Sequence, residues 1–281
     1  MRRLAGLVDL SGKSRLPLAV DAVRWVVWAV ACLGGCLLPP TASWAQNPLA
    51  QPSDPAGAEE DADRPHELYF SRAAYSSLSW DRPTWGIDFP KADRQFLIGL
   101  ERLTVIDASG DENPVRLDDP DLRRFPLIYA VEVGYMALDE GERQGLRDYL
   151  LAGGFLIVDD FWGTWEWENF EQEISAVLPE YSIVDLPLDH PVLHVFYDIS
   201  EIVQVPNVHQ GRMGGATWER DGYFPALRGI SDENGRLMVV INWNSDLGDA
   251  WEWAEDPYYP LQFSNFAYQL GVNLIVYGMS H

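Results

Sequence analysis

Short apolar runs alternate along this chain with longer segments whose apolar residues recur at helical spacing. The apolar runs, which are typical of buried strands, lie at residues 68–70, 127–131 and 155–158. The segments with helical periodicity lie at residues 92–103, 139–150 and 170–177. Because strands that alternate with helices pair side by side, the pattern predicts an α/β fold with a mainly parallel sheet.

Local signals define several element boundaries. Asp139, followed by Glu142, predicts a capping box at the start of a helix. The apolar runs 225–230 and 237–241 flank a turn rich in Asp, Asn and Gly, which predicts a hairpin. Two further segments are expected near the C-terminus, residues 259–270 as a helix and residues 273–277 as a strand or helix.

The first 45 residues have the layout of a secretory signal peptide. A basic start precedes an apolar run at residues 25–38, and small residues at 43 and 45 fit a cleavage site. The run is shorter than the roughly 20 residues that a membrane-spanning helix needs. An uncleaved anchor or a buried helix remain alternatives, as does a lipoprotein whose lipid is attached at Cys36. The layout predicts export to the periplasm or cell envelope.

Two regions follow the predicted leader. Residues 46–66 are rich in Pro, Ala and acidic residues, which predicts a disordered linker. Residues 67–281 are expected to form one domain. Both cysteines of the chain, Cys32 and Cys36, belong to the leader, so the mature protein would have neither a disulfide nor a thiolate nucleophile. The mature chain is expected to have no transmembrane span.

The chain is strongly acidic, with a formal net charge of −23. Because the predicted leader is basic, its removal leaves the mature protein more acidic still. Such a surface repels nucleic acid and suits cationic partners, divalent cations or neutral polymers such as glycans. Acidity that only keeps an exported protein soluble is the alternative interpretation.

Two groups of polar residues follow buried strands, where ligands of open α/β sheets bind. Asp159 and Asp160 end the 155–158 strand and are candidate catalytic residues or metal ligands; alternatively, one caps a helix and the other is solvated. Asn242, Asn244 and Asp246 follow the 237–241 strand and are candidate ligand-binding residues, with Asp246 also a candidate metal ligand. Their spacing is not that of an EF-hand, and Asx turns are the alternative. We expect both groups to face one crevice.

Two other residue types have candidate roles. His281 is a candidate acid or base if the C-terminus lies near Asp160, although chain ends are more often mobile. Tryptophans accompany acidic residues in the loops, and Trp162 is a candidate platform for a sugar ring. Packing in the core around these loops is the alternative for all of them.

Six motifs together resemble a bacterial family known as domain of unknown function 4159, over about residues 67–281. They are Arg72-Ala-Ala-Tyr75, the runs at 88–97 and 153–163, Asp189-His-Pro191, Asn242-x-Asn-x-Asp246 and Ser280-His281. Arg72 is a further candidate ligand-binding residue. The resemblance implies a flavodoxin-like, three-layer sandwich of the kind found in class I glutamine amidotransferases and trehalose-utilisation proteins. It implies no particular reaction.

The resemblance also permits a test for amidotransferase chemistry. Class I amidotransferases carry their nucleophilic Cys on a strand-to-helix elbow, and the matching segment here is residues 159–163, which has neither Cys nor Ser. Glutaminase chemistry is therefore not expected. We expect an envelope protein that binds a ligand, a partner protein or a glycan without catalysis. The alternatives are a carboxylate- or metal-dependent hydrolase of an envelope glycan and a structural role in an envelope complex.

Overall fold

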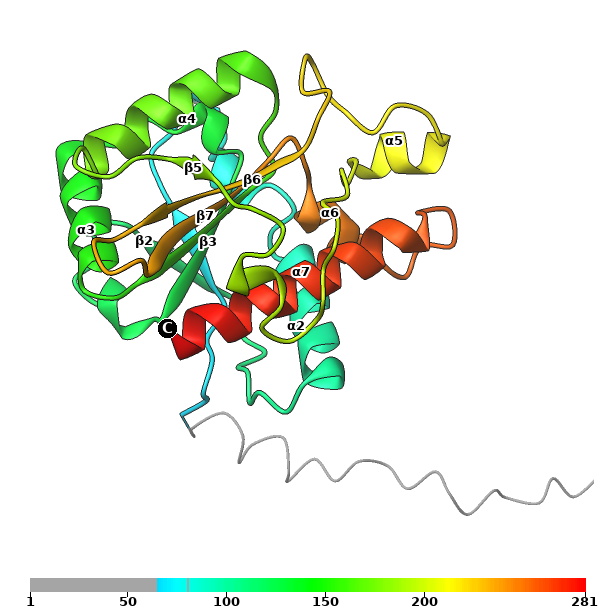
Figure 1. Ribbon diagram of the computed structural model, residues 1–281, viewed down its shortest axis with the longest axis horizontal. Helices are drawn as coiled ribbons and strands as arrows, with labels where there is room; N and C mark the ends of the chain where they lie inside the picture. The colour runs from blue at the N-terminus through cyan, green and yellow to red at the C-terminus, as the bar shows by residue number, and fades with distance from the viewer. Residues whose placement is uncertain (1–64, 80) are drawn as a thin grey trace, which may run out of the picture. The chain divides into compact units, whose positions relative to one another are not determined.

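A seven-stranded sheet lies at the centre of the computed structural model, which describes residues 65–79 and 81–281 (Figure 1). The strand order is β2-β1-β3-β4-β7-β6-β5. The first five strands in this order pair in parallel, whereas β6 and β5 are antiparallel to their neighbours. The strands are β1 (Ser71–Ala74), β2 (Asn113–Arg116), β3 (Leu127–Val131), β4 (Phe155–Asp159), β5 (Val184–Asp185), β6 (Ala226–Ser231) and β7 (Leu237–Trp243).

Helices cover both faces of the sheet. In Figure 1, α3 and α4 lie on one side of the strands, and α2 and α7 lie on the other. The α-helices are α2 (Lys91–Leu103), α3 (Glu140–Leu151), α4 (Gly163–Val177), α5 (Val208–Met213), α6 (Leu247–Glu252) and α7 (Leu261–Ser280). Short 3₁₀ helices are η1 (Thr84–Gly86), η2 (Leu122–Arg124), η3 (Val133–Tyr135) and η4 (Pro191–Leu193). The domain is therefore α/β with a mostly parallel sheet, as the sequence pattern predicts.

The central strands are buried on both faces, which explains their continuous apolar sequences. In β3, Leu127 and Tyr129 pack in one core together with Phe96 of α2. The alternate residue Ile128 packs in the opposite core with Leu146 of α3. Because side chains of a strand alternate between its two faces, one apolar run supplies both cores.

Several predicted boundaries are confirmed. Asp139 accepts a hydrogen bond from the Glu142 N–H at 2.9 Å, and the Glu142 carboxylate accepts one from the Asp139 N–H at 3.0 Å, so the capping box is present. The predicted hairpin is β6 and β7. The first helix is α2, one residue longer than the predicted segment.

One prediction about the elements is wrong. The first strand is Ser71–Ala74 and not 68–70; Leu68 forms only an isolated bridge with Ala108. The predicted helix at 259–270 and the segment 273–277, predicted as a strand or helix, are both helical and belong to one helix, α7, because the apolar residues on its buried face continue without a break. The predicted leader and residues 46–64 of the predicted linker lie outside the described residues. No helix in the described part of the chain combines the length and hydrophobicity needed to cross a bilayer.

The parallel strands bring four loops to one edge of the sheet. Because β1, β3, β4 and β7 run in the same direction, the segments that follow them leave at the carboxyl edge. Asp88, Glu132, Asp160 and Asp246 lie on these four segments. This edge therefore gathers acidic residues that are far apart in the sequence.

Candidate functional site

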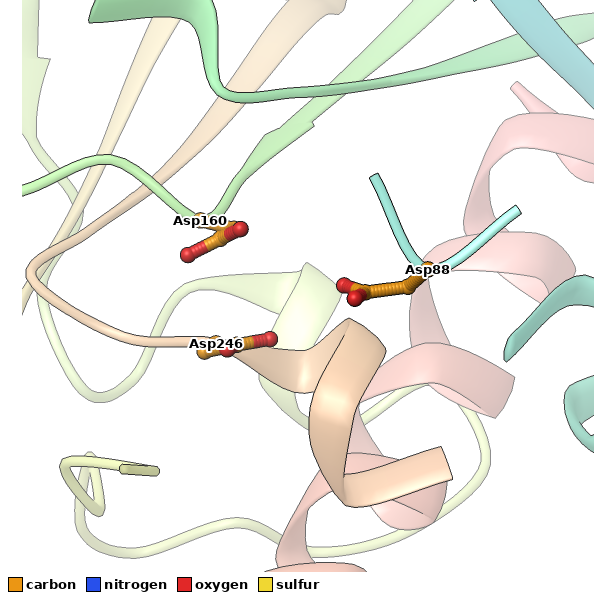
Figure 2. A group of neighbouring side chains, drawn as sticks. All are labelled: Asp88, Asp160 and Asp246. Atoms are coloured by element: carbon orange, nitrogen blue, oxygen red, sulfur yellow. The ribbon is translucent and has the colours of Figure 1, made fainter. Parts of the chain in front are cut away.

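Three aspartates meet at the carboxyl edge of the sheet. Asp88 follows β1, Asp160 follows β4 and Asp246 follows β7. Carboxylate oxygens from the three residues lie within 4.8 Å of one another. In Figure 2 the Asp88 carboxylate points toward those of Asp160 and Asp246. The sequence analysis named Asp160 and Asp246 as candidate metal ligands, and the structure brings them together with Asp88, which it missed.

The aspartates line a small cavity of about 140 Å³. Its lining is dominated by carboxylates and includes one basic residue, Arg220. The lining residues are Ile87, Asp88, Glu132, Asp160, Trp162, Glu166, Asn207, Glu219, Arg220, Asp246 and Asp249. Among these residues there is no histidine and no cysteine, so the ligands that the cavity offers are oxygen atoms. Oxygen ligands suit hard cations such as Ca²⁺ and Mg²⁺.

The backbone around this cavity is unusual. Among the described residues, five that are not glycine have a positive φ: Asp88, Glu132, Asp160, Arg220 and Asn244. The first four line the cavity. Side chains with a Cβ disfavour this conformation, and strained residues of this kind concentrate at ligand sites and active sites.

Asp88 has an incomplete set of partners. Its Oδ2 atom is buried, yet no described residue forms a hydrogen bond with it. Buried polar atoms nearly always have a partner, because desolvation without one costs about 1–3 kcal/mol. The carboxylate that carries this atom points toward Asp160 and Asp246, as Figure 2 shows. An ion or a ligand group in the cavity would supply the missing interaction.

Arg72 positions Asp88 and does not reach the cavity. The Arg72 side chain is buried and forms an ion pair with Asp93. Its Nη1 atom donates a hydrogen bond to the carbonyl of Ile87 at 3.3 Å. The prediction that Arg72 binds a ligand directly is therefore corrected: burial and the pairing with Asp93 occupy the guanidinium.

Asp160 is held by its backbone and by one indole. Its N–H donates to the Ser245 carbonyl at 3.1 Å, and its carbonyl accepts from the Glu132 N–H at 2.9 Å. Its Oδ1 atom accepts from Trp162 Nε1 at 3.1 Å. Trp162 is only 3% exposed, so it cannot present a free face to a sugar ring. The predicted platform is corrected to a residue that orients Asp160.

Asp159 is a structural carboxylate. Its Oδ2 atom accepts hydrogen bonds from Tyr129 Oη at 2.6 Å and from the N–H groups of Leu247 and Gly248 at 2.9 and 3.1 Å. Its Oδ1 atom accepts from Asn242 Nδ2 at 2.7 Å. These hydrogen bonds stabilise both the N-terminus of α6 and the buried Asp159 carboxylate. Asp159, predicted as a candidate metal ligand or catalytic residue, does not line the cavity, and both of its carboxylate oxygens already have hydrogen-bond donors.

The asparagines after β7 also position other groups. Asn242 is buried and holds Asp159, as described above. Asn244 accepts a hydrogen bond from the Gly163 N–H at 2.8 Å and donates one to the Phe224 carbonyl at 2.7 Å. Asp246 caps α6 by accepting from the Asp249 N–H at 2.7 Å, and it still reaches the cluster. Asn242 and Asn244, predicted to bind a ligand, instead fix the loops that carry the aspartates.

His281 lies at the other edge of the sheet. Its ring stacks on Tyr277 with the centroids 4.2 Å apart, and Tyr277 packs against Phe155 at the start of β4. Asp160 follows the opposite end of the same strand. Because a strand advances about 3.3 Å per residue, the length of β4 separates the two sites. The prediction that His281 acts with Asp160 is corrected.

Burial and like charges change the acidity of the cluster. Burial raises the pKa values of Asp88, Asp160 and Asp246 well above the ordinary range, and neighbouring carboxylates raise them further. Burial also raises the pKa of Glu132 to about 7, with Glu166 adding to the effect. The cavity therefore holds protons near neutral pH, and a bound cation would displace them.

Residues 70–279 match the family model described as Domain of unknown function (DUF4159). The chain belongs to this family. A search of curated proteins found no match. Asp88 opens the 88–97 motif that already resembled DUF4159 in the sequence. That motif was the signal that could have added Asp88 to the candidate site.

A second group of acidic residues shares Asp88. Oxygens of Asp88, Asp249 and Glu252 also lie within 4.8 Å of one another. Glu252 forms an ion pair with Lys91 at 3.5 Å, and Asp249 accepts hydrogen bonds from the N–H of Val208 and from Trp253 Nε1. Protein groups therefore compensate both Asp249 and Glu252 in this DUF4159 domain, whereas the Oδ2 atom of Asp88, which both groups share, has no hydrogen-bond partner among the described residues.

Proposed function

We propose that this domain binds a divalent cation between Asp88, Asp160 and Asp246 and uses it to hold a ligand at the carboxyl edge of the sheet. The observation that carries the proposal is the convergence of three aspartates from separate loops, one of which has a buried Oδ2 atom without a hydrogen-bond partner. Buried carboxylates of like charge repel one another and lose hydration. A divalent cation offsets both costs.

The composition of the cavity lining supports calcium as the ion to test first. The carboxylate oxygens of the cluster lie within 4.8 Å of one another, so one divalent cation can contact all three residues. Ca²⁺ is bound by several carboxylates in flexible geometry, whereas Mg²⁺ usually keeps several water molecules and one or two carboxylates. Water and the neighbouring glutamates would complete the coordination, because Ca²⁺ takes six to eight oxygen ligands.

We further propose that the domain has a flavodoxin-like fold related to that of class I glutamine amidotransferases. The order of the parallel strands, β2-β1-β3-β4-β7, supports this proposal, because it is the order 2-1-3-4-5 of such sheets. Asp160, with a φ of 50°, occupies the strand-to-helix elbow where an amidotransferase has its Cys. A carboxylate there fits cation binding and does not fit thioester chemistry.

A metal-dependent hydrolase of an envelope glycan is the second candidate. The observation that favours it is Glu132, which lines the same cavity and has a pKa of about 7 because of its burial and the nearby Glu166. A group with this pKa can exchange protons with a water molecule near neutral pH. If the protein is such a hydrolase, the Glu132→Gln variant should lose turnover on a polymer that the wild type cleaves. Export to the periplasm or cell envelope, which the leader sequence supports, fits both candidates.

Calorimetric titration of the purified chain with CaCl₂ tests the cation proposal directly. We expect saturable binding to the wild type and a loss of affinity of at least tenfold in Asp88→Asn and Asp246→Asn, because each substitution removes one charged ligand. The matched control is Asp121→Asn, which removes the same charge from an exposed position in the turn before β3. Titrations with MgCl₂ and ZnCl₂ define selectivity.

Two results would overturn the proposal. One is an absence of heat and of any change in melting temperature on addition of Ca²⁺, Mg²⁺ or Zn²⁺ to the folded protein. The other is binding that all three variants retain equally, because it would reflect only the acidic surface. Circular dichroism of each variant establishes that the comparison concerns folded protein.

A further inference from the structure

Exposed aromatic side chains lie on two segments that also contribute residues to the lining of the acidic cavity. Trp165, in the first turn of α4, is 50% exposed, and its ring contacts Tyr135 edge-on with the centroids 5.4 Å apart. Tyr223 and Phe224 are 55% and 80% exposed. They belong to the segment that also contributes Arg220 to the cavity lining. Exposed apolar patches bordered by polar residues mark interaction sites.

Direct contacts connect Trp165 to the cavity. Arg220 donates a hydrogen bond from Nη2 to Tyr135 Oη at 2.8 Å and forms an ion pair with Glu166 Oε1 at 2.6 Å. Glu166 and Arg220 both line the cavity, and Trp165 contacts the same tyrosine. Trp165 is therefore linked to the acidic cavity through Tyr135 and Arg220. We call the group formed by Trp165, Tyr135, Arg220 and Glu166 the aromatic rim.

The size of the cavity indicates where a ligand would lie. Sites that enclose a small-molecule ligand usually measure about 300–1,000 Å³. The cavity here measures about 140 Å³, which leaves room for a cation and a few ligand atoms only. Most of any ligand would rest on the aromatic rim, with one polar end reaching the cation.

The chemistry of the aromatic rim selects among ligand classes. The acidic surroundings repel anionic polymers, and a divalent cation held by the aspartates would occupy the place that a cationic group would otherwise take. A neutral, hydroxyl-rich ligand meets neither obstacle. Its hydroxyl groups can accept from Arg220, donate to Glu166 and coordinate a calcium ion, and its apolar faces can pack on an indole.

We infer that the aromatic rim binds a neutral saccharide whose ring packs on Trp165 and whose hydroxyl groups reach Arg220, Glu166 and the cation. This inference rests on the proposed cation site and names the ligand class that the site takes. Trp165 is the stacking residue, in place of the buried Trp162 that the sequence pointed to. Two adjacent residues of α4 would have different roles in binding the saccharide. Trp165 faces solvent and can stack on a sugar ring, whereas Glu166 is buried and lines the cavity.

The inference is tested by calorimetry with neutral hexasaccharides of glucose, mannose and N-acetylglucosamine, in CaCl₂ and in EDTA. We expect at least one of them to bind in CaCl₂ and to lose at least tenfold in affinity in EDTA. Trp165→Ala should lose at least tenfold in saccharide affinity and keep the wild-type affinity for Ca²⁺. Phe196→Ala is the matched control, because Phe196 is 48% exposed and follows η4, which packs on the other face of the sheet.

The outcomes separate this inference from the proposed function. If Ca²⁺ binds but none of the hexasaccharides does, the saccharide inference fails and the cation site stands. Saccharide binding that EDTA or Trp165→Ala leaves unchanged also overturns the inference, because the contact would lie elsewhere. A further titration uses a lysine hexapeptide. If the peptide binds and Ca²⁺ abolishes this binding, the cavity takes a cationic side chain and the saccharide inference is overturned.

Discussion

Charged side chains are arranged differently at the two edges of the sheet. At the amino edge, charges occur as pairs of opposite sign: Arg236 contacts Asp232 at 3.3 Å and donates to the carbonyls of Leu150 and Gly154. At the carboxyl edge, carboxylates are buried beside other carboxylates. The amino edge is complete within the chain itself. At the carboxyl edge, the buried Oδ2 atom of Asp88 has no hydrogen-bond partner among the described residues, and this is where we propose that a cation binds.

The largest expected effect comes from removing the one carboxylate of the carboxyl edge that is fully compensated. Asp159→Ala removes the acceptor of hydrogen bonds from Tyr129, Asn242 and two N–H groups of α6. Because these donors are buried, we expect the free energy of unfolding to fall by about 3 kcal/mol. Urea denaturation measures it. Asp121→Ala, at an exposed position near the amino edge, should change stability by less than about 0.5 kcal/mol. Equal stability of the two variants would contradict the structural role of Asp159.

The second prediction concerns the cation. At a Ca²⁺ concentration one hundred times the dissociation constant, the free energy of unfolding should rise by about 2.7 kcal/mol. For a domain of this size the melting temperature should increase by roughly 5–10 °C. Differential scanning calorimetry measures the melting temperature of the Ca²⁺-bound protein in CaCl₂ and of the Ca²⁺-free protein in EDTA.

The Asp88→Asn variant tests the cation prediction further, because its stability relative to the wild type should differ in sign between EDTA and CaCl₂. In EDTA this variant should be more stable than the wild type, because it removes one of several repelling charges. In CaCl₂ it should lose the gain that the wild type shows. A variant that is less stable than the wild type in EDTA would mean that Asp88 has a structural partner after all.

Trp162→Phe should have a smaller effect, confined to affinity. The substitution keeps an aromatic ring in the buried position and removes the hydrogen bond from Nε1 to Asp160. Partners that orient metal ligands typically contribute tenfold or more to metal affinity. We expect Ca²⁺ affinity to fall about tenfold while saccharide stacking on Trp165 persists. Unchanged Ca²⁺ affinity in titration would show that the indole does not orient the carboxylate.

The smallest expected effect is on the pH dependence of stability, and its sign differs between the edges. Burial raises the pKa of Glu132 from 4.5 to about 7, so the folded state binds more protons than the unfolded state between these values. In EDTA, stability from this group is present below pH 4.5 and is lost as the pH rises through 7. The Glu132→Gln variant should lose about 1 kcal/mol less stability than the wild type as the pH rises through this range. The effect is small because Glu132 is partly exposed and solvent screens its charge.

The amino edge should respond in the opposite direction. Burial raises the pKa of Asp232, but the N–H groups and guanidinium of the turn lower it further, so the net pKa lies below 3.8. Its contribution to stability is therefore present at neutral pH and lost in acid. Urea denaturation at pH 3, 5 and 8 with Asp232→Asn and Glu132→Gln measures both slopes. If the contributions of Asp232 and Glu132 to the free energy of unfolding changed with pH in the same direction, the contrast between the edges would be wrong.

The sequence pointed to two of the three clustered aspartates because burial patterns reveal where strands end. Asp160 and Asp246 follow strongly apolar strands, and residues at the carboxyl ends of parallel strands share one edge. Asp88 was harder to find, because β1 has only four residues and a long segment separates it from Asp88. The difference between Trp162 and Trp165 could not be predicted, since both lie in the same acidic segment and only packing distinguishes their exposure.

The sequence by itself determined the alternation of strands and helices, the capping box, the hairpin and the presence of carboxylates at the ends of buried strands. These features depend on neighbouring residues, and periodicity and turn chemistry report them directly. Only the tertiary structure decided which carboxylates meet. Asp159 and Asp160 are adjacent, yet Asp159 accepts hydrogen bonds from N–H groups at the start of α6, whereas Asp160 joins the cluster with Asp88. Strand order and register bring these distant residues together, and those depend on the packing of the whole sheet.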